Sequence, residues 1–323
     1  MNIITSVNDY RNAANDIFQN FVYLYGYDML INELIFPKIS QIIKWLSNND
    51  WDMSGWCKLE NYLYIFLCVA KNIEIIDINI NGENDNNKED SITKIFIIFK
   101  SMFDIDQKYL QILRTICEIV DSCGKLFYLQ DKELIKNAYD FLKSGLNLEF
   151  SLPYCSNSLR NLLIDNKDII CKEKNELINL YHKKLENNVL NYDDLIFVID
   201  GIVEALAYSD VEENINEENQ NENNSVDYDY IKTNLEEILK PWTTYLKIAK
   251  EHLERNIKLS IDDSNKLANI IRIISSISKS AFEVISKNNL NIMLEIFNEL
   301  WNYISYLLNT IQSDIKRKIY SFY

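Results

Sequence analysis

Hydrophobic residues recur along most of this chain at the three- and four-residue spacing of helices that bury one face. The segments with this pattern come in pairs, separated by short polar breaks, as antiparallel helix hairpins do. We predict six pairs and the start of a further helix after Gln312: 7–25 with 28–47, 54–73 with 91–103, 107–122 with 131–146, 154–164 with 168–187, 192–208 with 229–254, and 262–286 with 290–311. The chain is therefore predicted to be all-α.

The pairs follow one another at intervals close to the 40–47-residue period of HEAT-type repeats, once two polar insertions are set aside. A single hairpin cannot bury its own hydrophobic face, so neighbouring pairs are expected to stack. We predict one right-handed α-α superhelix, a HEAT/ARM-like solenoid of about six hairpins over residues 1–323. First helices are expected on its convex side and second helices on its concave side.

The two insertions, at about 81–90 and 209–229, are rich in Asn, Asp and Glu and have almost no hydrophobic side chains to bury. We predict mobile, passive loops at both places. The alternative for the longer one is an acidic mimic that competes with a binding partner.

Composition narrows the class of protein further. With only 6 Gly and 3 Pro, the chain has too few turn residues for a β-sandwich or β-barrel. The chain has 33 Lys and Arg residues and 48 Asp and Glu residues, so its net charge is −15. This negative charge argues against direct binding of nucleic acid and favours basic proteins as partners.

The cysteines and the hydrophobic runs bear on the compartment. The six cysteines form no CxxC pair and several lie in hydrophobic helical runs, which is typical of reduced thiols inside the cell. No run approaches the length of a membrane span, and the N-terminus lacks the order of a signal peptide. We therefore expect no insertion into membranes.

Candidate catalytic chemistry is sparse. The two histidines, His182 and His252, lie among Lys and Glu residues, and no metal-binding, phosphate-binding or nucleophile-elbow motif is present. We expect neither an enzyme nor a cofactor, with an all-helical enzyme as a rival hypothesis. Such an enzyme would need polar residues converging in a closed hydrophobic pocket.

One segment has a distinctive order of residue types. Its helical stripe consists of Trp56, Leu59, Leu63, Phe66, Val69 and Ala70, with Glu60 beside it. Tyr10, Arg11 and Asp16 precede it in a segment that ends with Leu24, Tyr25 and Gly26, where a helix needs a left-handed C-terminal residue. Further motifs follow in the same order: Phe141 to Leu146, Asp200-Gly201-Ile202, and Pro241 within a helix.

This collinear order resembles the central repeats of karyopherin-β (importin-β superfamily) nuclear transport receptors, in the transportin-SR and importin-thirteen branch. The resemblance implies that the stripe residues are scaffold, that Glu60 caps or pairs locally, and that the chain is about a third of a receptor. It implies binding of Ran-GTP, of basic or Arg/Ser-rich cargo and of nucleoporins, and shuttling between cytoplasm and nucleus. The rival is a cytoplasmic HEAT or armadillo scaffold that never meets Ran.

Acidic positions on second helices are the candidates for contact with a basic partner. They are Glu133, Asp140, Glu236 and Glu237. The alternative for all four is that they are solvated charges on helix faces.

Overall fold

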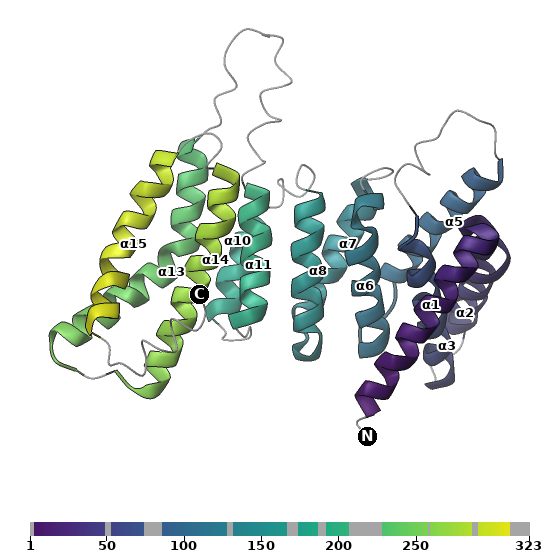
Figure 1. The fold of residues 1–323 in the computed structure, drawn as a ribbon, viewed down its shortest axis with the longest axis horizontal. Helices are drawn as coiled ribbons and strands as arrows, with labels where there is room; N and C mark the ends of the chain where they lie inside the picture. Colours follow the sequence, from purple (N-terminus) through teal and green to yellow (C-terminus); the bar gives the residue numbers. More distant parts are fainter. Residues whose placement is uncertain are drawn as a thin grey trace, which may run out of the picture. The chain divides into compact units, whose positions relative to one another are not determined.

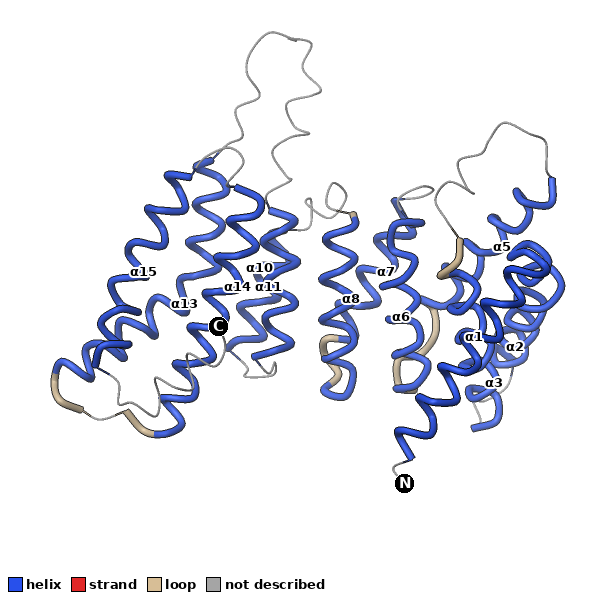
Figure 2. The backbone as a smooth tube through the Cα atoms, in the orientation of Figure 1, coloured by secondary structure: helices blue, strands red, loops and turns tan. Residues whose placement is uncertain are grey.

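In the computed structural model, the residues that are described form helices joined by short turns and loops. These are 3–48, 53–73, 86–127, 132–166, 174–186, 192–206, 228–257, 259–285 and 290–310. Within these ranges no strand is present (Figure 2). The all-α fold predicted from the hydrophobic pattern is confirmed.

The chain divides into two compact units, Met1–Asn166 and Lys167–Tyr323. The division falls between the first and second helices of the fourth predicted pair. The single superhelix with one handedness over residues 1–323 stays a prediction.

Unit 1 consists of two rows of helices (Figure 1). In the first row α1 packs against α3, α3 against α6, and α6 against α8; in the second row α5 packs against α2 and against α7. The elements of unit 1 are α1 (Ile3–Met29), the π-helix η1 (Leu30–Ile35), α2 (Phe36–Asn48), α3 (Met53–Ala70), α5 (Asn86–Phe103), α6 (Leu110–Phe127), α7 (Lys132–Gly145), the 3-10 helix η2 (Glu149–Ser151) and α8 (Leu152–Asp165). This alternation of first and second helices is the arrangement expected of stacked hairpins.

Unit 2 repeats the pattern. In the first row α11 packs against α14, and in the second α13 packs against α15, while α10 lies against α11. The helices are α10 (Lys174–Glu186), α11 (Tyr192–Leu206), α13 (Tyr228–Glu254), α14 (Ile261–Ile285) and α15 (Leu290–Thr310). Tyr181 of α10 donates a hydrogen bond from its hydroxyl to the backbone carbonyl of Ile238 in α13, at 3.1 Å. Pro241 lies inside α13, as expected from the sequence.

The stripe on α3 supplies much of the core of unit 1. Leu59, Leu63 and Phe66 are buried, and Phe66 meets Phe99 of α5 edge to face. Trp56, at the start of the stripe, is half-buried and stacks on Tyr109, with 5.6 Å between ring centroids. The predicted scaffold role of these residues is confirmed.

Glu60, beside the stripe, does not pair locally. Its carboxylate accepts a hydrogen bond from the guanidinium of Arg11 in α1, 49 residues away, and another from the hydroxyl of Thr115 in α6 at 2.9 Å. Both charged side chains are mostly buried. The expectation of a local role was wrong because stacking brings three first-row helices together, which a sequence pattern within one helix does not reveal.

Gly26 separates the regular part of α1 from η1. Its φ of 76° and ψ of 156° lie in a region that side-chain-bearing residues rarely adopt. The positive φ expected at Gly26 is present, but its ψ lies outside the left-handed helical region and Gly26 does not end the helix, which continues to Met29. After it, the π-helix brings Ile31 and Ile35 into the core, while Asn32 donates a hydrogen bond to Ser91 of α5 at 2.8 Å.

Helix α5 begins at Asn86, inside the segment predicted as the loop 81–90. The prediction failed there because residues 86–90 are polar and show no hydrophobic periodicity. A helix can begin with polar residues, since only the turns that pack against other helices need a hydrophobic face. Residues 81–85 and all of the second insertion up to 227 lie outside the described residues, as does Cys171.

Candidate functional site

The predicted acidic residues lie beside second-row helices in both units. Asp140 lines a cleft between the end of α5, the α5–α6 loop and α7, which we call the α5–α7 cleft. Glu236 and Glu237 line a second cleft between α13 and α15, the α13–α15 cleft. Glu133 is exposed in the first turn of α7 and lines neither cleft.

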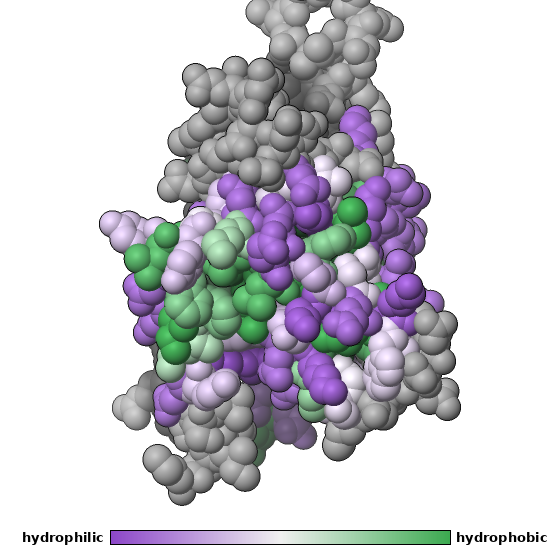
Figure 3. Space-filling model, turned by 90° about the vertical axis from the view of Figure 1, so that its right-hand side faces the viewer, coloured by the Kyte–Doolittle hydropathy of each residue, from purple (hydrophilic) through white to green (hydrophobic). Residues whose placement is uncertain are grey.

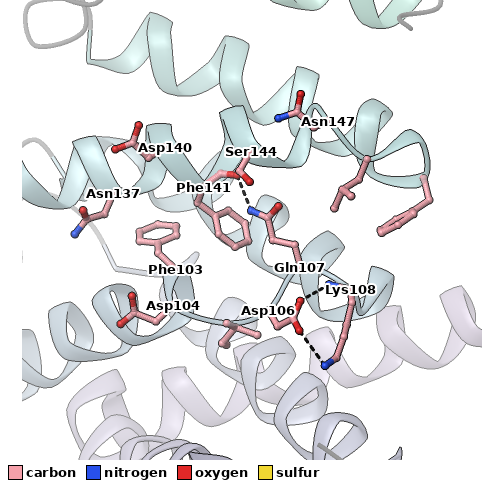
Figure 4. A pocket seen from close by; sticks show the side chains of 13 residues that line it. Phe103, Asp104, Asp106, Gln107, Lys108, Asn137, Asp140, Phe141, Ser144 and Asn147 are labelled. Carbon is pink, nitrogen blue, oxygen red and sulfur yellow. Dashed lines mark hydrogen bonds and ion pairs between the residues drawn. The ribbon is translucent and has the colours of Figure 1, made fainter.

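The α5–α7 cleft has a volume of about 760 Å³ (Figure 4). Phe103 and Phe141 lie in it with ring centroids 5.6 Å apart, and Phe150 is partly exposed at its edge. Three carboxylates surround these rings: Asp104 and Asp106 from the loop and Asp140 from α7. The cleft thus combines aromatic surface with negative charge.

The α5–α6 loop is held by two of its own side chains. The backbone N–H of Lys108 donates to Asp106 at 3.1 Å, and the Lys108 ammonium pairs with the same carboxylate at 2.9 Å. The hydrogen bond from the Lys108 side chain is the main reason that the pKa of Asp106 is lowered. Gln107 donates a hydrogen bond from Nε2 to the backbone carbonyl of Phe141 at 2.7 Å, which ties the loop to α7.

The carboxylates of this cleft are accessible to a partner. Asp104 and Asp140 are exposed, and Asp140 pairs with Lys143, its neighbour one turn along α7, at 3.1 Å. A guanidinium or ammonium group entering the cleft would meet carboxylates and the faces of aromatic rings together, and both attract cations. An exposed intrahelical pair such as Asp140–Lys143 contributes little and is easily exchanged.

The α13–α15 cleft, of about 640 Å³, is more polar. Four glutamates line it: Glu236 and Glu237 from α13, and Glu295 and Glu299 from α15. Two lysines of α13, Lys232 and Lys240, also line it. One of them, Lys232, pairs with Glu295 at 2.7 Å. Thr243 donates its hydroxyl proton to the carbonyl one turn back, at 3.1 Å, so its oxygen can still accept.

The sequence prediction found part of each cleft. Asp104 and Asp106 were missed because they lie in a loop between helices and not on a second helix. Glu295 and Glu299 lie on a predicted second helix and follow from the same rule that selected Glu236 and Glu237. The aromatic residues of the first cleft gave no signal, because Phe at helical spacing usually indicates core.

Neither of the two histidines lines the α5–α7 cleft or the α13–α15 cleft. His252 is exposed, and His182 is half-buried with its ring 5.0 Å from that of Tyr181. Among the side chains that the structure describes, no cluster of three His, Cys, Asp or Glu residues is arranged to hold a metal ion. In the same part of the chain, no helix is long and hydrophobic enough to cross a membrane.

Comparison of the sequence with models of known protein families and with curated proteins gives no match.

Proposed function

We propose that this protein is a helical-repeat scaffold that binds basic, extended segments of other proteins along its second-row helices. The observation that carries the proposal is that both units place an accessible acidic cleft there. Helical-repeat proteins use such surfaces, built from successive repeats, to hold long partners. The α5–α7 cleft adds aromatic rings, which favour Arg over Lys because a guanidinium also stacks on aromatic faces.

The more specific form of the proposal is a nuclear transport receptor. It rests on the collinear resemblance to transportin-SR and importin-thirteen receptors, and the two-row helical stacking is compatible with it. On this hypothesis the basic segment is Arg/Ser-rich cargo, Ran-GTP displaces it, nucleoporins assist passage, and the protein shuttles between cytoplasm and nucleus. The second candidate is a cytoplasmic scaffold with the same clefts and no response to Ran.

Binding of basic peptides is tested with fluorescent peptides of alternating Arg and Ser, of Lys and Ser, and of Gly and Ser. We expect the Arg peptide to bind most tightly and the Gly peptide not to bind. Asp104→Asn with Asp140→Asn should weaken Arg-peptide binding by about fivefold, as should Glu236→Gln with Glu237→Gln.

The matched control neutralises Glu251 and Glu254, which are exposed near the end of α13 and line neither cleft. Glu251→Gln with Glu254→Gln removes the same charge and should change the affinity by less than about twofold. Equal weakening by the control and the cleft variants would mean that net charge alone attracts the peptide, and the cleft proposal would be abandoned.

Ran separates the two candidate functions. The Arg/Ser peptide, bound to the protein encoded by the natural open reading frame, is titrated with Ran locked in its GTP or GDP form. Release of peptide by the GTP form alone supports the transport receptor. Equal behaviour of both forms, with peptide binding intact, removes that hypothesis and leaves the scaffold.

A further inference from the structure

Helix α1 exposes a hydrophobic stripe that no part of the described chain covers. The stripe, which we call the ridge, consists of Tyr10, Ala14, Ile17, Phe21 and Leu24. Ile17 is 52% exposed and Leu24 66% exposed. The alternating spacing of four and three residues is that of a coiled-coil seam, which packs against other helices.

The ridge lies away from the contact between α1 and α3. Arg11, one residue after Tyr10, points toward Glu60 of α3, so the ridge occupies another side of the helix. In Figure 3, which looks onto the side of unit 1 where α1 and α2 lie, hydrophobic side chains gather beside hydrophilic ones. Asp9 and Asp16, both exposed, follow the ridge along one rim.

A hydrophobic groove of about 370 Å³ lies between α14 and α15. The residues that matter for its shape are Ile271, Ser275 and Ser278 on α14, and Leu294, Phe297 and Trp301 on α15. Leu294 is 51% exposed and Trp301 59% exposed. The two serines are small, so a facing helix with large side chains can approach closely.

The groove faces away from the rest of unit 2. Ser276 and Ser280 of α14 donate hydrogen bonds to Asp200 of α11, at 2.7 and 3.2 Å. At 3.6 residues per turn, Ser278 points to the opposite side of α14. On α15, Glu295 faces α13 through its ion pair with Lys232. Trp301, six residues further on, lies about 120° around the helix from Glu295 and so on another side of α15.

Charge and spacing match between the two surfaces. Arg272 and Lys279 follow the groove on α14, seven residues apart, and Asp9 and Asp16 follow the ridge at the same interval. Seven residues span about 10.5 Å of helix, so the two acidic residues and the two basic residues have the same spacing along their helices. Groove residues also recur at intervals of seven: Ile271 and Ser278, and Leu294 and Trp301.

We infer that the protein associates head to tail with a second copy of itself, by docking the α1 ridge of one copy into the α14–α15 groove of the next. This contact extends from one copy to the next the packing between first-row helices that is found inside each unit. Within unit 2, α14 packs against α11 on its other side. The ridge and groove are different surfaces, so each copy keeps one of each free and the association can extend into chains. A symmetric pairing of two ridges would instead bring like acidic rims together.

The test is the molar mass in solution, measured by light scattering and sedimentation from about 1 to 300 µM, the range of modest interfaces. The wild-type protein should form complexes that grow with concentration. Ile17→Asp in the ridge and Trp301→Asp in the groove should each remain monomeric, with at least a tenfold loss of affinity. Both residues are exposed, so helicity and melting temperature should not change.

Mixing the two variants is the decisive experiment. The Ile17→Asp copy keeps an intact groove and the Trp301→Asp copy keeps an intact ridge, so the mixture should give a one-to-one complex that grows no further. The matched controls are Gln19→Asp, exposed on the side of α1 opposite the ridge, and Ile248→Asp, exposed on α13, and both should associate like the wild type.

Charge reversal tests the orientation. Asp16→Lys and Lys279→Glu should each weaken association, and the double variant should restore it. A wild-type protein that stays monomeric over the whole range overturns the inference in favour of a different partner for the ridge. Association lost in the ridge variant but kept in the groove variant overturns it in favour of a symmetric dimer.

Discussion

At the scale of single residues, Gly145 leaves no room for a side chain. A Cβ atom there would overlap the Sγ of Cys155 in α8. That thiol cannot move aside freely, because it is buried and its sulfur lies 3.8 Å from that of Cys117. The glycine therefore sets how closely α7 and α8 pack.

We predict that Gly145→Ala destabilises the protein by about 2 kcal/mol, the usual cost of overpacking a core. The sign of this change in the free energy of unfolding is informative, because replacing Gly by Ala inside a helix otherwise stabilises a protein by up to about 1 kcal/mol. In a Cys155→Ala background the clash disappears, and the same substitution should cost nothing or stabilise. The measurement is the free energy of unfolding in urea for the four members of this cycle.

Gly124→Ala is the matched control for this cycle. Its Cβ would meet the end of the Asp165 side chain at 3.2 Å, a contact that a small rotation relieves. An equal cost of Gly145→Ala with and without Cys155 would show that the thiol is not what excludes the methyl group.

Burial also keeps two of the cysteine thiols protonated. Burial raises the pKa of Cys123 to about 12, and it is also the main cause that raises the pKa of Cys68. Both stay protonated in the folded protein at neutral pH and act as small hydrophobic side chains. The cysteines were predicted in this role from their place in hydrophobic runs, and for these two the structure confirms it.

At the scale of elements, the first row of unit 1 is joined by charged and polar side chains as well as by its core. The Arg11 guanidinium also lies over the ring of Tyr64, 4.7 Å from its centroid, and the Tyr64 hydroxyl donates to the backbone carbonyl of Arg11 at 2.8 Å. Burial is the main cause that raises the pKa of Tyr64 to about 12, so this hydroxyl remains a donor. The cluster fixes how α1 lies on α3.

We predict that Arg11→Met destabilises unit 1 by about 3 kcal/mol, because it leaves the mostly buried Glu60 carboxylate without its cation. Glu60→Leu added to Arg11→Met should recover part of that loss. Both are measured by urea unfolding. Glu254→Gln is the control, since it removes the exposed Lys250–Glu254 pair, 3.7 Å apart, and should cost less than about 0.5 kcal/mol. A similar cost for Arg11→Met and for the control would mean that the buried pair does not hold the row together.

The helices themselves were largely predictable from hydrophobic spacing. The predicted 290–311 corresponds to α15, Leu290–Thr310, because a strong periodic stripe shows where a helix must bury its face. The start of α5 and the π-helix after Gly26 were not predictable. Polar helix ends have no periodicity, and the π-helix packs against helices α1, α2 and α5, which its own six residues do not reveal.

At the scale of the whole molecule, the candidate clefts were predictable only in part. Asp140, Glu236 and Glu237 follow from the order of first and second helices. The loop carboxylates Asp104 and Asp106 could not be placed, since a loop's course depends on which helices it joins. The division at Asn166 was also hidden, because the same periodic pattern continues on both sides of it.

This division leads to the last prediction. A chain that ends at Asn166 keeps both helix rows of unit 1, its core around Leu63 and Phe66, and the whole α5–α7 cleft. We expect it to be helical by circular dichroism and to unfold cooperatively in urea, with a slope that scales with its smaller buried surface. It should also bind the Arg/Ser peptide, with the same fivefold loss on Asp104→Asn with Asp140→Asn. An isolated unit 1 that lacks a cooperative transition would show that its core needs unit 2. If unit 1 folds but does not bind the peptide, the α13–α15 cleft remains as the proposed binding site.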